Sequence, residues 1–326
     1  MSTANPYQPL LDELVTTFDS GITKSLEWRK STLESLLKVF TEPKNVQKWL
    51  DARIADLGGG EVVGISEILT VKGEIVHALE SLDEWAADRP AGLGDPTREV
   101  EGQDRRIVRP TPKGVTLTIG TWNFPINLQF VPVVDAIAAG NCCFLKPSEL
   151  APATAQLVYD MVAEYLPSNA FKVVVGGIPE ITNVLALKFD HITVTGSAFV
   201  GKIVMTAAAK HLTPCTLELG GKNPTFVDKS ADLELAANRM VLAKTHNAGQ
   251  WCVDLDYILV DESVADEMTG CVVSAVKRIL GGPDDQNPKN GIDKSQRWLN
   301  SIVNERNVER LKAMLEEDHG GKVCCC

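Results

Sequence analysis

The chain has little positive charge and no basic cluster. Its 326 residues include 32 Lys and Arg against 43 Asp and Glu, which gives a net charge of −11. Nucleic-acid-binding surfaces are positively charged, so this balance argues against DNA or RNA as a partner. The start, MSTANPYQPLLDELV, lacks the features of a secretory signal, and no apolar run reaches the ~18 residues of a membrane span. These absences predict a soluble, cytoplasmic protein without a membrane span.

The sequence also lacks the cysteine patterns of zinc sites and of disulfide-stabilised domains. Of its eight cysteines, Cys142 and Cys143 are adjacent in an apolar run, and Cys324 to Cys326 end the sequence. No CxxC pair or His/Cys cluster has the spacing of zinc ligands, so we expect a reducing compartment and no metal. The final CCC is not a prenylation box, which needs a cysteine fourth from the end.

The pattern of apolar and polar residues changes near residue 112. Residues 7–85 carry apolar side chains at helical spacing, and 86–112 are polar and irregular. After that, β-rich runs alternate with amphipathic helical segments, which predicts βαβ units on a mostly parallel sheet. The expected strands are 114–120, 142–147, 171–177, 191–196 and 215–221.

This alternation predicts an α/β protein built on a parallel, doubly wound (Rossmann-like) sheet. We expect N-terminal helices in 1–85, a crossing segment in 86–112, the sheet domain in 113–219 and a second α/β unit in 220–326. Ligands of such sheets bind at the carboxyl ends of the strands. The segments that follow the strands are therefore the candidates for chemistry.

The segment TGSAFVGKI (195–203) has the glycine spacing of a phosphate loop, from Gly196 to Gly201. A nucleoside-triphosphatase loop has Ser or Thr after its lysine, and here Ile203 follows Lys202, which disfavours that class. A strand, a turn and a helix N-terminus still form a site for a pyrophosphate. A tight turn that requires glycine explains the spacing equally well.

A second such segment, FLKPSE (144–149), ends a predicted strand. Lys146 is suited to hold ribose oxygens or phosphate, and Glu149 to accept hydrogen bonds from ribose hydroxyls. The alternative is a solvated loop in which Ser148 caps the next helix and Glu149 stands in its first turn.

Two further residues have open interpretations. Asn123, in TWNFP (121–125), is suited to donate a hydrogen bond to a developing oxyanion, or it forms an ordinary turn before a helix starting at Pro125. Glu218, in LELGG (217–221), lies between leucines, where we expect burial of a carboxylate to be costly. It is then either a general base or one half of a buried salt bridge.

Cys252 ends the stretch HNAGQWC (246–252). A single cysteine is more often a packing residue than a nucleophile. Its place just after a helix end, behind a Gly-Gln pair, distinguishes it from Cys142, Cys143, Cys215 and Cys271, which lie in apolar runs.

Taken together, these segments resemble the aldehyde dehydrogenase superfamily. WNFP, GNCCFLKPSE, VTGSAFVGK, LTPCTLELGGKNP and NAGQWC occur in that family's order. KIVMTAAAKHLTPCTLELGGKNP and CVDLDYILV resemble its class 3, fatty-aldehyde branch. The likeness runs from about residue 14 to about residue 323.

The resemblance implies catalytic roles. Cys252 would attack the aldehyde carbonyl, the Asn123 side chain and the Cys252 N–H would form the oxyanion hole, and Glu218 would activate the hydrolytic water. Lys146 and Glu149 would hold the adenosine ribose of NAD or NADP, and the 196–201 turn its pyrophosphate. The residues that the resemblance places at the cofactor are Trp122, Lys146, Ser148, Glu149, Gly196, Ser197, Val200, Gly201 and Leu219.

The resemblance also makes 113–219 the NAD(P)-binding domain and 220–326 a partial catalytic domain. Its substrate would be a small-molecule aldehyde, and relatives form homodimers. Trp251 stands where the family usually has a smaller residue, and Thr121 where it usually has proline. The later E-[IV]-F-G-P segment and the C-terminal dimer strand are not found here, so we expect a C-terminally truncated member. The alternative to an active enzyme is a non-catalytic cofactor-binding or interaction fragment.

Overall fold

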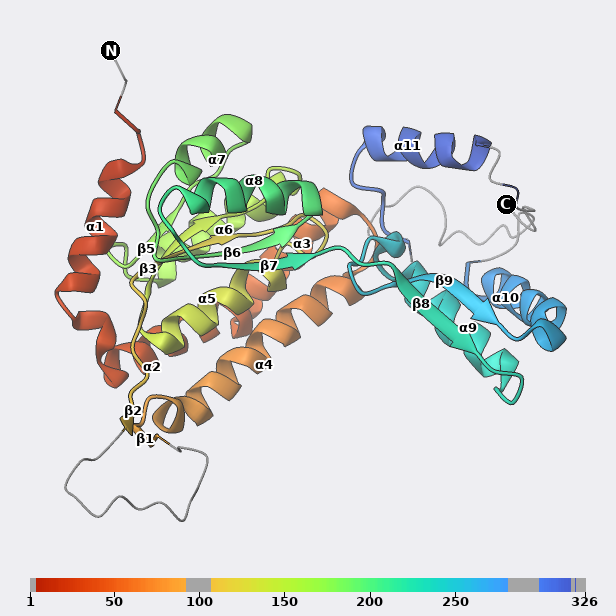
Figure 1. Ribbon diagram of the computed structural model, residues 1–326, viewed down its shortest axis with the longest axis horizontal. Helices are drawn as coiled ribbons and strands as arrows, with labels where there is room; N and C mark the ends of the chain where they lie inside the picture. Colours follow the sequence, from red (N-terminus) through yellow and green to blue (C-terminus); the bar gives the residue numbers. More distant parts are fainter. Residues whose placement is uncertain (1–3, 92–106, 281–298, 318–319, 321–326) are drawn as a thin grey trace.

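The computed structural model describes residues 4–91, 107–280, 299–317 and 320 (Figure 1). Most of the expected crossing segment, the polar stretch 281–290 and the terminal cysteines lie outside these residues. On either side of the first gap, β1 (Arg89–Pro90) and β2 (Ile107–Val108) pair antiparallel.

The N-terminal part is helical, as the apolar spacing predicts. Ser25 begins the second helix because its hydroxyl accepts the Trp28 N–H at 3.1 Å, and Pro43 opens the third, where a missing N–H costs nothing. Within the described residues, no helix combines the length and apolar composition needed to cross a membrane. The elements are α1 (Gln8–Asp19), η1 (Ile22–Lys24), α2 (Leu26–Thr41), α3 (Pro43–Leu57) and α4 (Glu61–Trp85).

The predicted parallel sheet is confirmed, with five strands in the order β5-β4-β3-β6-β7. The chain runs outward from β3 to β5 and returns to β6 beside β3, which creates the switch point at which such sheets bind ligands. The strands are β3 (Val115–Ile119), β4 (Cys142–Lys146), β5 (Phe171–Val173), β6 (His191–Gly196) and β7 (Cys215–Leu219). The helices between them are α5 (Asn127–Ala139), α6 (Pro152–Tyr165), α7 (Ile178–Leu185) and α8 (Ala198–Ala209).

Helices cover both faces of the sheet. In Figure 1, α8 lies on one side of the strands and α5 on the other, next to α2 and α4. The rings of Phe40 and Trp49 stack, and Phe130 meets both edge to face, with centroids 5.0–5.6 Å apart. Aromatic packing therefore joins α2, α3 and α5. The N-terminal helices and the sheet therefore share one hydrophobic core.

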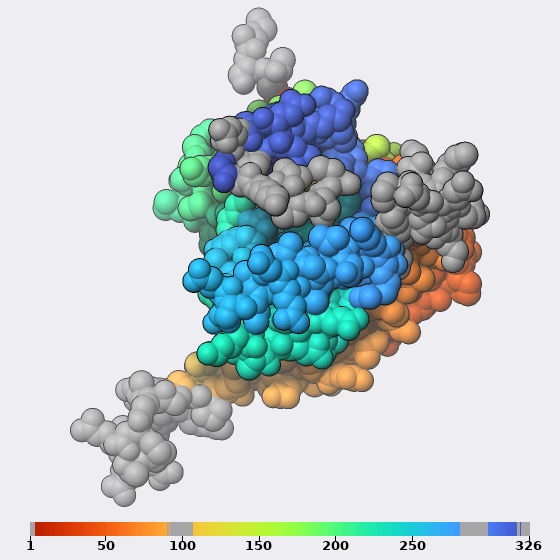
Figure 2. Space-filling view, turned by 90° about the vertical axis from the view of Figure 1, so that its right-hand side faces the viewer, coloured from red at the N-terminus to blue at the C-terminus, as the bar shows by residue number. Residues whose placement is uncertain are grey.

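A second, smaller core lies beyond the sheet. It contains Val227, Met240 and Met268, among others, and the predicted boundary at 219/220 lies between β7 and β8, which pack in different cores. Figure 2 looks onto this end of the molecule, with α10 across the middle and α11 above it. The elements are β8 (Asn223–Val227), α9 (Leu233–Thr245), η2 (His246–Gly249), β9 (Leu255–Val260), η3 (Glu262–Val264), α10 (Ala265–Leu280) and α11 (Glu305–Glu316).

The helix start predicted at Ser148 is wrong. Helix α6 begins at Pro152, and Ser148 instead accepts the Leu150 N–H at 3.3 Å in the loop before it. The free N–H groups of the first turn, those of Ala153 and Thr154, donate to the Asp56 carboxylate at 2.9 and 2.8 Å. A carboxylate from α3 thus takes the capping role that sequence reasoning gave to a local serine.

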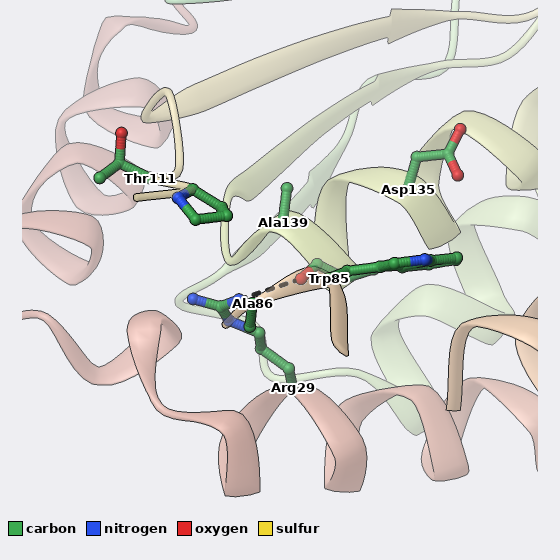
Figure 3. A pocket seen from close by; sticks show the side chains of 8 residues that line it. Arg29, Trp85, Ala86, Thr111, Asp135 and Ala139 are labelled. Carbon is green, nitrogen blue, oxygen red and sulfur yellow. Dashed lines mark hydrogen bonds between the residues drawn. The ribbon is translucent and has the colours of Figure 1, made fainter. Parts of the chain in front are cut away.

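Helix α5 ends at Gly140, which has a tertiary partner. Gly140 adopts φ +86°, and the Arg29 guanidinium lies against it, donating to the Ala138 carbonyl at 3.1 Å (dashed in Figure 3). Thr23 also donates to the Gly140 carbonyl at 2.8 Å. A Cβ at Gly140 would lie 2.8 Å from Arg29 Nε, so no larger residue fits without moving this arginine.

We therefore expect Gly140→Ala to lower the free energy of unfolding by about 2 kcal/mol, from left-handed strain and displacement of Arg29. Gly73→Ala is the matched control, since Gly73 lies inside α4 with no atom within 4 Å of its added Cβ. We expect Gly73→Ala to raise the free energy of unfolding by about 0.5–1 kcal/mol. Urea unfolding of both variants tests this, and equal stability of the two would contradict it.

Candidate active site

A cavity of about 220 Å³ opens at the carboxyl edge of the sheet. It brings together Asn123, Glu218 and Cys252, the three residues for which the sequence resemblance implies catalytic roles. Trp122, Gly196, Ser197 and Leu219, expected at the cofactor, line the same space. The full lining is Thr121, Trp122, Asn123, Thr195, Gly196, Ser197, Glu218, Leu219, Gly220 and Cys252.

These residues meet because the strands are parallel. The ends of β3, β6 and β7 are hydrogen-bonded neighbours, so the residues that follow them gather at one edge. Cys252 comes from the second unit, in the turn between η2 and β9. The cavity therefore joins the end of the sheet to the start of the smaller unit.

The turn before Cys252 has an uncommon backbone. Asn247, Ala248 and Gly249 adopt φ of 50°, 55° and 72° in succession. Glycine and asparagine tolerate this left-handed region, whereas an alanine there costs on the order of 1 kcal/mol. The helical run of α9 is thus stopped within one turn, and the chain reverses to place Cys252 at the cavity.

Asn123 is held from two sides. Its Oδ1 accepts from the Thr121 hydroxyl at 3.1 Å, and its Nδ2 donates to the Gln250 carbonyl at 3.0 Å. A primary amide has two N–H groups, so one remains for a ligand after the other is used. These two bonds fix the amide plane, and Asn123 lines the same cavity as Cys252.

The other cysteines near the sheet are poorly suited to nucleophilic chemistry. Burial raises the pKa of the Cys142 thiol to about 12, and it also raises the pKa values of Cys143 and Cys215. The thiolate is the reactive form, so these three remain thiols near neutral pH. Cys252, by contrast, is only partly buried and lines the cavity, and its carbonyl accepts from Asn223 Nδ2 at 3.0 Å.

Glu218 lines the cavity, but the expectation that it is buried is wrong. Its side chain is exposed, because Leu217 and Leu219 point toward α8 while Glu218 lies on the other face of β7. Within the described residues Glu218 makes no salt bridge, so the buried ion pair considered as its alternative is not found there. The carboxylate is free to meet water in the cavity.

The N-terminus of α8 lies beside this cavity. Ser197 caps the helix, accepting the Val200 N–H at 3.3 Å, which leaves the N–H groups of the first helical residues without partners inside the helix. Gly201 lets α8 approach β7, because a Cβ there would lie 3.0 Å from Leu219 Cδ2. The 196–201 turn is thus a strand-to-helix turn of the kind that binds anions.

Lys146 is the last residue of β4 and Glu149 follows the strand, and neither lines the Cys252 cavity. Lys146 is 2% exposed, and its Nζ donates to the Pro147 carbonyl at 2.7 Å and lies 3.6 Å from Glu149 Oε2. Burial lowers the pKa of Lys146, and the nearby Glu149 opposes that shift. In the part of the chain that is described, no three His, Cys, Asp or Glu side chains form a group able to hold a metal.

A separate groove of about 500 Å³ runs between α7 and α8. Its walls combine exposed apolar side chains such as Phe199, which is 74% exposed, with two lysines. It is lined by Thr182, Leu185, Ala186, Phe199, Lys202, Ile203, Thr206, Ala207 and Lys210.

Comparison with known proteins identifies the family. The model described as "Aldehyde dehydrogenase family" matches residues 25–325. The chain belongs to this family. It is 41% identical over 314 residues to rat "Aldehyde dehydrogenase, dimeric NADP-preferring", covering 93% of this chain and 65% of that protein. It is 41% identical over 301 residues to rat "Aldehyde dehydrogenase family 3 member A2", covering 92% and 59%.

A solved structure of similar fold supports the same family. "Substrate bound state of Staphylococcus Aureus AldH" superposes with a TM-score of 0.87 at 32% identity, covering 97% of this chain and 66% of that one. The predicted family and its class 3 branch are thereby confirmed. The chain spans about two-thirds or less of the length of these aldehyde dehydrogenases.

The residue before Cys252 lies in an aromatic cluster. Trp251 packs with Phe124 and His246, its ring centroid lying 5.3 and 5.0 Å from theirs. Burial lowers the pKa of His246, with Arg53 acting in the same direction. Trp251 does not line the Cys252 cavity, so its bulk is accommodated by this aromatic cluster.

Sequence reasoning missed two residues that hold the candidate site. Gln250 donates to the Ser301 carbonyl at 3.1 Å and accepts the Val303 N–H at 2.9 Å, which ties the turn to a distant segment. Asn247 donates to the Asn123 carbonyl at 2.8 Å. The left-handed requirement of an Asn-Ala-Gly run was the one available signal for Asn247.

Proposed function

We propose that this chain oxidises an aldehyde to the carboxylic acid, with NAD(P)⁺ as hydride acceptor and Cys252 as nucleophile. The observation that carries the proposal is the meeting of Cys252, Asn123 and Glu218 in one cavity beside the α8 N-terminus. A medium- or long-chain aliphatic or aromatic aldehyde is the proposed substrate. The name of the rat "dimeric NADP-preferring" relative supports NADP as one of the two cofactors and a dimer as the assembly.

The first step is addition. The Cys252 thiolate attacks the carbonyl carbon, a C–S bond forms, and the electron pair moves to the oxygen. The second N–H of Asn123 and the backbone N–H of Cys252 donate to that oxyanion. Such preorganised donors stabilise developing charge, typically by about 3–4 kcal/mol per donor.

The second step completes the oxidation. When bound, NAD(P)⁺ would supply the hydride acceptor, so that the thiohemiacetal carbon becomes the carbonyl of a thioester on Cys252. Glu218 then takes a proton from water, the hydroxide attacks the thioester, and the C–S bond breaks to return the thiolate. The balance is one aldehyde, one water and one NAD(P)⁺ consumed, and one acid, one NAD(P)H and one proton formed.

The residues present fit a dinucleotide. Unpartnered N–H groups at the start of α8 suit a pyrophosphate, and the absence of a side chain at Gly201 allows the helix to stand close to β7. Lys146 and Glu149 would hold the adenosine ribose from the neighbouring strand. The apolar groove between α7 and α8 would take the adenine.

Calorimetry and turnover on one monodisperse sample test the proposal. We expect NAD or NADP to bind, and the same sample to form reduced nicotinamide and acid in equal amounts when an aldehyde is added. Cofactor binding without turnover over a panel of aliphatic and aromatic aldehydes would contradict it. That result would favour the alternative of a non-catalytic cofactor-binding fragment.

A further inference from the structure

A buried ion pair lies behind the candidate active site. Arg53 on α3 and Glu67 on α4 have side chains 1% and 0% exposed, and Arg53 Nε donates to Glu67 Oε1 at 2.9 Å. Burial raises the pKa of Glu67, and the charge of Arg53 opposes that shift. Burying two charges is costly and commonly does not stabilise a fold, so a role beyond stability is worth seeking.

Arg53 reaches from this pair to the turn before Cys252. Its Nη2 donates at 2.9 Å to Oδ1 of Asn247, which is fully buried and has a left-handed backbone. The amide nitrogen of Asn247 in turn donates to the Asn123 carbonyl at 2.8 Å and the Gln250 carbonyl at 3.3 Å. One guanidinium therefore fixes the orientation of the amide that links the two loops of the cavity.

Glu67 directly holds the loop that contains Asn123 (121–127). Its Oε2 accepts the backbone N–H groups of Ile126 and Asn127 at 2.9 and 3.2 Å, where α5 begins. These residues come three and four positions after Asn123 in the chain. The Asn123 loop and the Cys252 turn are thus both attached to the same buried pair.

We propose that Arg53 is a positioning residue that, through Asn247, sets the Asn123 amide and the Cys252 turn in the geometry needed for oxyanion stabilisation. This inference rests on the proposed function. The planar guanidinium donates to Glu67 and Asn247 in two fixed directions, which a lysine ammonium does not reproduce. The two partners are 14 and 194 residues away in sequence.

Arg53→Met and Arg53→Lys test the proposal. A misplacement of about 1 Å at a reacting centre costs on the order of 100-fold in rate, so we expect kcat to fall by about that factor in Arg53→Met. Arg53→Lys keeps a positive charge beside Glu67 and should fold even if Arg53→Met does not, with a smaller loss of kcat. The NAD(P) dissociation constant should change much less than kcat in both, because α8 is untouched.

Arg29→Met is the matched control. Arg29 is also a buried arginine, 8% exposed, but it holds the opposite end of α5 through backbone carbonyls. Arg29→Met should lower the melting temperature while kcat per folded molecule stays close to that of the unchanged chain. An equal loss of kcat in Arg29→Met and the Arg53 variants would mean that general destabilisation explains both, and would overturn the proposal.

A double-mutant cycle asks whether Arg53 acts through Asn247. Asn247→Gly keeps the left-handed backbone and removes the side-chain link. If the pathway is as proposed, Arg53→Lys lowers kcat much less in the Asn247→Gly background than in the unchanged chain. Additive losses would contradict a route through Asn247.

Hydrogen–deuterium exchange separates this inference from the proposed function. Exchange of peptides covering 121–127 and 246–254 should rise in both Arg53 variants and not in Arg29→Met, whether or not the chain oxidises aldehydes. Raised exchange in an inactive chain would refute the function and leave the positioning of the loops supported. Unchanged exchange, or unchanged kcat in an active Arg53→Lys, would overturn the inference.

Discussion

Cys252→Ala should abolish NAD(P)-dependent aldehyde oxidation, with a loss of kcat on the order of 10⁴-fold or more, because removal of a covalent nucleophile leaves only binding and the oxyanion donors. Cys252 is the cysteine that lines the cavity with Asn123 and Glu218. Steady-state formation of reduced nicotinamide measures the effect. Cofactor binding should persist in this variant, which shows that the loss is chemical.

Cys215→Ala is the control for this result. Cys215 lies on β7, three residues before Glu218, and burial raises the pKa of its thiol. Its removal should leave kcat close to that of the unchanged chain. Full activity in Cys252→Ala, or its loss in Cys215→Ala, would mean that the nucleophile is misassigned.

Glu218→Gln should lower steady-state turnover by about 10²–10⁴-fold, the usual contribution of a general base. The amide keeps the size of the side chain but does not accept a proton from water. Addition and hydride loss do not use Glu218 in the proposed sequence of steps, so a single turnover of reduced nicotinamide should still form. Rapid-mixing absorbance would separate that burst from the slowed steady state.

Glu267→Gln serves as the comparison for Glu218→Gln. Glu267 is an exposed carboxylate on α10 and lies away from the residues that line the cavity. Glu267→Gln should leave both the burst and the steady-state rate of reduced nicotinamide formation unchanged. A Glu218→Gln variant that loses the burst as well would assign this residue to an earlier step.

Much of the fold follows from local pattern. The strand predicted at 114–120 is β3 at Val115–Ile119, and 191–196 is β6, because β-branched and apolar runs bounded by Gly or Pro have few alternatives. β8 was missed because NPTFV is short and begins with a polar residue and a proline. Ser148 failed as a cap because Asp56, distant in sequence, supplies a stronger one.

The candidate site, too, could be predicted from the sequence only in part. Gly196 and Ser197 could be placed from the sequence, because strand-turn-helix spacing is local. The exposure of Glu218 could not, since it depends on which face of β7 the helices cover. Arg53 and Asn247 are 194 residues apart, and no pattern along the chain reports such a contact.

The central claim is that oxidation proceeds through an acyl group on Cys252. Peptide mass spectrometry of the Glu218→Gln variant, quenched after mixing with NAD(P)⁺ and an aldehyde, tests it most directly. The account predicts a peptide containing Cys252 that carries the acyl mass of the chosen aldehyde, present only when cofactor is included. An unmodified Cys252 peptide after a burst of reduced nicotinamide, or the acyl mass on another cysteine, would contradict the account.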